Sequence, residues 1–172
     1  RAVADISDDE ARMQMILASS MAGIGFGNVG VHLPHAMAYP VAGMVREFRP
    51  AGYATQNPLV PHGMSVILHT PAVARFTAPT SPERHLIAAK ALGADVSRAS
   101  LNDAGRILAD RVIHFMQTLA MPRGLQAVGY SMSDMVALVE GTLTQQRLLK
   151  LSPRSAGADE LAKLFEESMV IW

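Results

Sequence analysis

The side chains best suited to metal chemistry in this sequence are its six histidines, because the absence of cysteine excludes thiolate ligands and disulfides. They are His32, His35, His62, His69, His85 and His114. A histidine on a helix is more often an exposed or hydrogen-bonded residue than a metal ligand. Spacing is therefore needed to decide which of the six are candidates.

Two pairs of histidines have helical spacing. His32 and His35 are three residues apart, so on a helix they lie on the same face. His62 and His69 also share a face, but at 1.5 Å per residue they lie about 10.5 Å apart along a straight helix. Because metal–imidazole bonds are about 2.0–2.1 Å long, one metal cannot take both rings unless the helix breaks between them.

Each of two histidines follows a proline where a helix is expected to begin, in Pro34-His35 and Pro61-His62. The positive end of a helix disfavours imidazolium, so both rings are expected to be neutral, the form that binds a metal. Two histidines fall short of the three protein ligands that catalytic zinc sites usually have. Spacing alone therefore leaves a structural role open for both.

A glycine motif, G-x-G-x-x-G at residues 25–30, imitates a dinucleotide-binding loop, with Glu47 near the position of an acidic ribose ligand. That binding mode requires a strand before the glycines. Residues 13–21 instead show apolar spacing of helical period, after a capping box at residues 7–10 that begins with Ser7. We interpret the glycines as small residues that allow a helix or a ligand to approach the backbone closely.

The elements that must position these residues are predicted to be helices throughout. Capping residues and prolines mark their starts near residues 8, 34, 62, 82, 100, 134 and 158. The glycine-rich residues 23–30 interrupt the pattern, residues 50–61 form a loop, and Pro71 kinks or ends the third helix. The last helix, residues 158–170, turns Leu161, Leu164 and Phe165 inward. We expect an all-α domain of about six or seven helices, without a strand pair.

Composition narrows the classes of function. The chain has 172 residues, which suits one domain, and 49% are hydrophobic. Lys+Arg and Asp+Glu are both 15, without a basic stripe, so we expect no nucleic-acid partner. We also expect no membrane partner, because no apolar run has the length of a span and no signal peptide is recognisable. The low charged content, 17%, suggests a surface that something else covers.

Two segments carry a family resemblance. Residues 23–40, GIGFGNVGVHLPHAMAYP, resemble the first signature of the iron-containing alcohol dehydrogenases, which have the dehydroquinate-synthase-like fold. Pro61-His62-Gly63, followed by an apolar helix, resembles the second signature. In that family the histidine before A-M-A and the histidine of P-H-G bind the metal. The resemblance therefore assigns metal-ligand roles to His35 and His62.

Other segments resemble the hydroxyacid–oxoacid transhydrogenase branch of that family. They are residues 45–63, residues 82–86 and residues 143–147, and Tyr39 stands where many family members have histidine. The resemblance implies that residues 1–172 form one domain, the helical C-terminal, metal-binding part of a two-domain enzyme. The nucleotide-binding α/β domain and two further metal ligands, an Asp and a His, have no counterpart here. His32 fits the branch but lies off the ligand position, and we interpret His69, His85 and His114 as structural or surface residues.

The resemblance implies a chemistry for the whole enzyme. Hydride would pass between a hydroxyacid or alcohol and NAD or a 2-oxoacid, such as 4-hydroxybutyrate and 2-oxoglutarate. A divalent metal, iron or zinc, would act as a Lewis acid on the substrate oxygen. NAD would be bound mainly by the missing N-terminal domain, so we assign no catalytic or cofactor-binding residue in this chain and expect it to be inactive alone. The cation for the substrate carboxylate would be Arg46, Arg49 or Arg147, although a solvated surface role stays open for each.

Several alternatives remain open at this stage. The chain could belong to another iron-containing NAD-dependent alcohol dehydrogenase or to a maleylacetate reductase. As an isolated helical module it could also serve interaction alone, without catalysis. We expect a cytoplasmic location, or the mitochondrial matrix in a eukaryote, and a homo-oligomer stays open.

Overall fold

All 172 residues, Arg1 to Trp172, are described by a computed structural model that consists of helices and loops without a strand. The predicted all-α class is confirmed. The chain divides into two compact units, residues 1–31 and residues 32–172, which are treated separately below. No single helix is long and apolar enough to cross a membrane, and α1 with α2 meets that criterion only when the two are taken together across their break.

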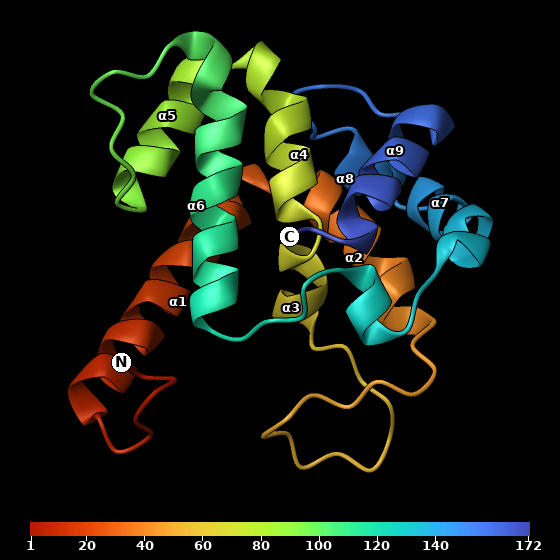
Figure 1. Cartoon of the computed structure of the whole chain (residues 1–172), viewed down its shortest axis with the longest axis horizontal. Helices are drawn as coiled ribbons and strands as arrows, with labels where there is room; N and C mark the ends of the chain where they lie inside the picture. Colours follow the sequence, from red (N-terminus) through yellow and green to blue (C-terminus); the bar gives the residue numbers. More distant parts are fainter. The chain divides into compact units, whose positions relative to one another are not determined.

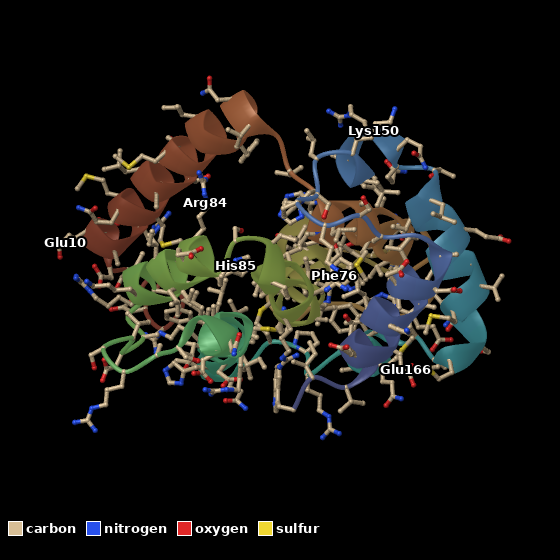
Figure 2. The ribbon with its side chains drawn as sticks, turned by 90° about the horizontal axis from the view of Figure 1, so that it is seen from above. Glu10, Phe76, Arg84, His85, Lys150 and Glu166 are labelled. Atoms are coloured by element: carbon tan, nitrogen blue, oxygen red, sulfur yellow. The ribbon has the colours of Figure 1, made fainter.

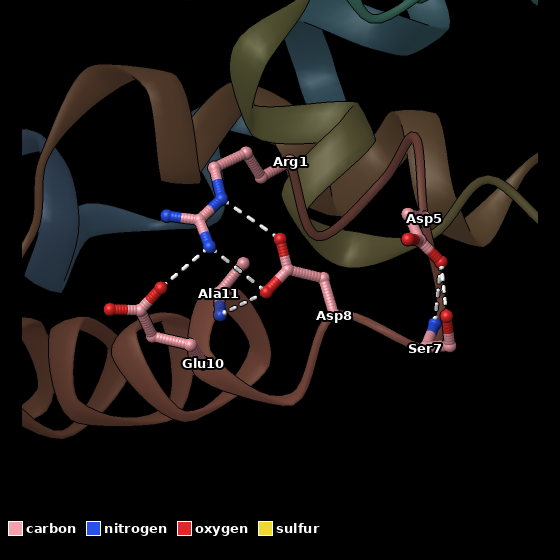
Figure 3. A network of polar contacts seen from close by, with 6 residues as sticks. All are labelled: Arg1, Asp5, Ser7, Asp8, Glu10 and Ala11. Atoms are coloured by element: carbon pink, nitrogen blue, oxygen red, sulfur yellow. Dashed lines mark hydrogen bonds and ion pairs between the residues drawn. The ribbon is translucent and has the colours of Figure 1, made fainter.

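The first unit contains helix α1, Asp9–Val29, and the turn before it. The predicted N-cap, Ser7, is wrong by one residue, because the Asp8 carboxylate accepts the hydrogen bond from the Ala11 amide at 3.0 Å. Arg1 holds that carboxylate in place from the other side, with Nε 2.8 Å from Oδ2 (Figure 3). Ser7 instead donates to Asp5 through both its amide and its hydroxyl.

The glycine-rich segment does not interrupt α1, contrary to the prediction. The helix continues through Gly23, Gly25 and Gly27 and ends at Gly30, where φ is +78°. A helix tolerates each glycine at a cost of roughly 1 kcal/mol relative to alanine, which is not enough to break twenty-one residues of helix. No atom lies within 4 Å of a Cβ built on Gly23, Gly25 or Gly27, so the structure shows no close neighbour there. Because the motif lies along the end of a helix, it lacks the preceding strand that a dinucleotide-binding loop requires.

The second unit has more helices than predicted (Figure 1). Proline at the second position of α4 begins a new helix after α3 rather than kinking one, and a break at Gln145 separates α7 from the short α8. The α-helices are α2 Leu33–Gly43, α3 His62–Ile67, α4 Thr70–Thr77, α5 Pro82–Ala91, α6 Ala104–Thr118, α7 Met135–Leu143, α8 Gln146–Leu149 and α9 Ala158–Met169.

The core of this unit forms where α4 lies between α6 and α9, and where α2 packs against α3 and α7 (Figure 1). The inward face predicted for α9 is confirmed, since Leu161, Leu164 and Phe165 are all buried. At the crossing of α4 and α6, Gly105 lets the two backbones approach: a Cβ there would lie 2.9 Å from the Arg75 Cα. The contacts of α2 with both α3 and α7 therefore hold in place the two helices that carry the candidate ligands.

Candidate metal centre

The two histidines assigned to a metal lie side by side. His35 is in the first turn of α2, and His62 is the first residue of α3, where Pro61 is the N-cap. Because α2 and α3 pack together, the two rings meet with their centroids 5.3 Å apart and their planes tilted by 56°. Both rings stand near helix starts, as predicted, and they lie close to each other.

This separation fits a shared metal ion. With bonds of about 2.0–2.1 Å and a tetrahedral angle, the centroids of two imidazoles on one metal lie roughly 5 Å apart. Burial lowers the pKa of His35, and the neighbouring His62 lowers it further. The neutral ring, which offers a lone pair to a metal, is therefore favoured at His35.

The pair is incomplete as a metal centre within this chain. No group of three or more His, Cys, Asp or Glu side chains is arranged to hold a metal ion. Zinc sites normally have at least three protein ligands, so two imidazoles leave positions to be filled by other groups. The arrangement matches a half-site, and the metal role of His35 and His62 stays a prediction.

His32 lies just before α2, and one of its ring nitrogens has an unexpected environment. Nδ1 is buried and has no hydrogen-bond partner. Burial lowers the pKa of His32, and nearby His35 and His85 lower it further. His35 is therefore close enough to influence the His32 ring electrostatically, yet His32 does not complete a three-ligand group.

His69 is a core residue. The helix does break between His62 and His69, at the junction of α3 and α4, but His69 is fully buried with its ring edge-on to Phe165. Neither of its ring nitrogens has a partner, and burial lowers its pKa to about 3. The structural interpretation of His69 agrees with this position.

The remaining two histidines have the environments expected of structural and surface residues. His85 on α5 is held at both nitrogens, with Nε2 3.0 Å from the Thr77 hydroxyl and Nδ1 2.9 Å from the Ser81 carbonyl oxygen. Figure 2 shows His85 on the side of α5 that faces the rest of the second unit. His114 on α6 is exposed, beside Phe115.

The structure distinguishes the three arginines considered for a substrate carboxylate. Arg46 donates to both oxygens of Asp134, at 2.8 and 3.0 Å, and to the Gly129 carbonyl. Arg49 donates to two backbone carbonyls of its own loop. Arg147 is exposed and engages no other group. Sequence reasoning missed the Arg46–Asp134 pair because 88 residues separate its members and no local pattern links them.

One cavity of about 410 Å³ opens between α4, α5 and α6, and no histidine lines it. Arg75 and Arg106 contribute its cationic groups. Arg106 is already paired with Asp103 and Asp110, at 3.0 and 3.3 Å. The residues that line the cavity are distinct from the histidine pair.

The sequence of this chain is similar to those of known proteins. A model of the Fe-containing alcohol dehydrogenase family, C-terminal, matches residues 1–169. The chain is 55% identical over 172 residues to the mitochondrial hydroxyacid-oxoacid transhydrogenase of Xenopus tropicalis, covering all of this chain and 37% of that protein. It is 52% identical over 173 residues to a probable mitochondrial hydroxyacid-oxoacid transhydrogenase of Dictyostelium discoideum, covering 32% of that protein. The chain thus spans about a third of the length of these relatives.

Solved structures show the same fold. A crystal structure of 1,3-propanediol oxidoreductase superposes with a TM-score of 0.84 at 26% identity, over 98% of this chain and 40% of that one. An alcohol dehydrogenase from Oenococcus oeni superposes with a TM-score of 0.85 at 23% identity, over 97% of this chain and 40% of that one. The predicted helical fold is therefore confirmed by known structures.

Proposed function

This chain belongs to the Fe-containing alcohol dehydrogenase family, whose C-terminal part it matches, and from this we propose that it supplies His35 and His62 as two ligands of a divalent metal, iron or zinc. The whole enzyme would be an oxidoreductase that moves hydride between a hydroxyacid and an oxoacid with NAD. The pair of rings 5.3 Å apart carries the proposal. The names of the relatives, which are hydroxyacid-oxoacid transhydrogenases, support the choice of substrates.

The contribution of this chain would be to bind and orient. A divalent metal at the two rings would act as a Lewis acid on the substrate oxygen, and NAD would carry the hydride. His35 would be kept neutral by burial, and the packing of α2 against α3 would fix the separation of the two rings. Preformed ligand geometry of this kind lowers the cost of ordering the site when metal binds.

NAD would be held mainly by residues outside these 172. The one glycine motif in the chain lies inside α1, so it lacks the strand and the exposed helix start that hold a dinucleotide phosphate. We therefore infer that residues 1–172 act as the helical part of a two-domain enzyme. Small hydroxyacids and oxoacids would be its partners, with neither nucleic acid nor membrane, and a homo-oligomer is compatible with the proposal.

A second candidate is a simple alcohol dehydrogenase of the same family. This candidate is supported by the structural match to 1,3-propanediol oxidoreductase at 26% identity. Location would follow the enzyme. The relatives are named as mitochondrial, which supports the matrix if the source is a eukaryote. In any other source the enzyme would be cytoplasmic.

The experiment uses a chimera in which this chain replaces the matching residues of the Xenopus tropicalis relative. A transhydrogenase converts 4-hydroxybutyrate and 2-oxoglutarate together without added NAD, because one bound cofactor serves both half-reactions. A simple dehydrogenase needs added NAD and releases NADH. Turnover of alcohols alone, with no exchange between the two acids, would reject the transhydrogenase proposal. The 172-residue chain by itself is expected to show no turnover, because nothing in it holds the nicotinamide in reacting geometry.

A further inference from the structure

The helix α7 runs along α2 in the opposite direction. Just beyond the end of α2, Arg46 donates to Asp134 at 2.8 Å, immediately before α7 begins. Further along, Gly141 of α7 lies against Pro40 of α2, since a Cβ at Gly141 would be 2.8 Å from the Pro40 Cβ. The chain of α7 therefore advances toward the N-terminal end of α2, where the histidine pair lies.

Helix α8 continues toward that end and packs against α2. Figures 1 and 2 both show α8, in blue, beside the beginning of α2, in orange. From Gly141 to Arg147 is six residues, and from Pro40 to His35 is five. The step from Pro40 to His35 lies within α2 and is roughly 7.5 Å at 1.5 Å per residue, whereas the step from Gly141 to Arg147 crosses the break at Gln145. Because the chain passes Gly141 toward the beginning of α2 and α8 packs against α2, Arg147 arises beside the N-terminal half of that helix.

The backbone of α8 is anchored while Arg147 remains available. Leu148 is buried at 2% exposure, which fixes the position of its neighbour in the chain. Arg147 itself is exposed and forms no hydrogen bond or ion pair, whereas Arg46 is occupied by Asp134. Arg84 is also exposed, but it lies on α5, which packs chiefly against α6 (Figure 2). Among the three arginines considered for the substrate carboxylate, position and availability together favour Arg147.

We propose that Arg147 binds the carboxylate of a hydroxyacid whose hydroxyl end lies at the His35–His62 pair, and thereby selects acids over uncharged alcohols. This inference rests on the proposed function. A guanidinium presents parallel N–H groups that match the two oxygens of a carboxylate, and such charge-assisted bonds are about twice as strong as neutral ones. A short-chain acid with its hydroxyl and its carboxylate at opposite ends suits two anchors set apart in this way.

The test compares substrates that differ in charge, in the chimera described above. Arg147→Gln is expected to raise the KM for 4-hydroxybutyrate about tenfold or more, since a hydrogen bond to a charged group is lost. The KM for 1-butanol, which has no carboxylate, and the bound metal are expected to stay unchanged. Arg147→Lys should retain part of the preference, because the charge remains without the paired donors.

A chemical readout checks the same contact without turnover. An arginine-selective dicarbonyl reagent should modify Arg147 more slowly when 4-hydroxybutyrate is present, as measured by mass spectrometry. Arg84 is the matched control in both experiments: Arg84→Gln should leave the preference for the acid intact, and 4-hydroxybutyrate should not protect Arg84.

The outcomes separate this inference from the proposed function. An equal change in KM for both substrates, no change for either, or an effect of Arg84→Gln in place of Arg147→Gln overturns the role of Arg147 while bound metal and turnover still support the metal proposal. A chimera that folds but holds no metal and turns over neither acid overturns the proposed function, and this inference with it.

Discussion

The imidazole of His69 stands edge-on to the ring of Phe165, with the centroids 5.3 Å apart and the planes at 84°. The side chain is fully buried, and neither ring nitrogen finds a partner. A neutral histidine always carries one N–H group. This buried donor therefore lacks a hydrogen bond, which costs about 1–3 kcal/mol of folding free energy. This residue stabilises the core by its shape and contacts, at the expense of an unpaired polar group.

His69 should make the fold sensitive to acid. Burial lowers its pKa to about 3 in the folded chain, whereas an unfolded histidine has a pKa of about 6.5. Between these values the unfolded state binds the extra proton, so the free energy of unfolding falls as the pH drops, by up to about 1.36 kcal/mol per pH unit. Urea denaturation at pH 7, 5 and 4 measures this slope.

Replacing His69 by leucine should reduce the dependence of the unfolding free energy on pH and raise that free energy at pH 4. Leucine cannot be protonated, so the unfolded state no longer gains a proton at this position. His114→Gln is the matched control, since His114 is exposed on α6 and should leave the slope unchanged. If His69→Leu and the original chain lost stability in parallel from pH 7 to pH 4, the source of acid sensitivity would lie elsewhere.

The pair formed by Arg46 and Asp134 should be structural rather than part of substrate binding. Hydrogen bonds from Arg46, and then from the Ser131 amide, lower the pKa of Asp134 to about 2. Because the folded pKa is depressed, the stabilisation is present above the unfolded value of about 3.9 and is lost as the pH falls toward 2. Arg46→Gln should raise the pKa of Asp134, observed through its carboxyl carbon by NMR.

The same variant should leave the KM for a hydroxyacid unchanged in the chimera, because Arg46 is committed to Asp134. Arg49→Gln, in the loop after α2, provides the control and should not alter the pKa of Asp134. A large increase in KM for Arg46→Gln, with the Asp134 pKa unaltered, would return Arg46 to the substrate site.

The crossing of α4 and α6 should not tolerate one added methyl group. In Gly105→Ala the new Cβ would lie 2.8 Å from the Ala78 Cβ and 2.9 Å from the Arg75 Cα, so the helices must move apart. Such overpacking costs about 1–3 kcal/mol, more than the gain of roughly 1 kcal/mol that alanine brings to a helix. Thermal unfolding should show a lower Tm. Gly43→Ala, with no atom within 4 Å of the new Cβ, should not lower it, and equal Tm values for the two variants would disprove this packing argument.

The helices were largely predictable from local patterns, but some of their boundaries were not. Helix α9 follows from its apolar spacing, and α5 ends just before Gly93, whose φ of +88° favours glycine. The start of α1 was misplaced because Ser7 and Asp8 are both good caps, and only the contact with Arg1 shows that the carboxylate is used. Such a choice depends on a neighbour outside the helix.

The candidate site was predictable in its parts, through the segments around His35 and His62. Their meeting depends on the packing of α2 against α3, which the loop of residues 44–61 connects and no periodicity encodes. The commitment of Arg46 to Asp134 depends on tertiary structure in the same way. The candidate ligands and cations can be identified in the sequence, whereas only the fold shows whether each side chain is free to bind a ligand or is already paired with another residue.

The most direct test of the central claim is a titration of the 172-residue chain with Zn(II), followed through the imidazole nitrogens of all six histidines by NMR. We expect His35 and His62 to shift together and to saturate at one metal ion per chain, with weak affinity because the other ligands are not supplied. His62→Ala should abolish the shift at His35, whereas His114→Ala should leave it unchanged. If His35 and His62 responded independently, or if His35 still bound Zn(II) equally well in His62→Ala, the two rings would not share a metal and the proposed site would be wrong.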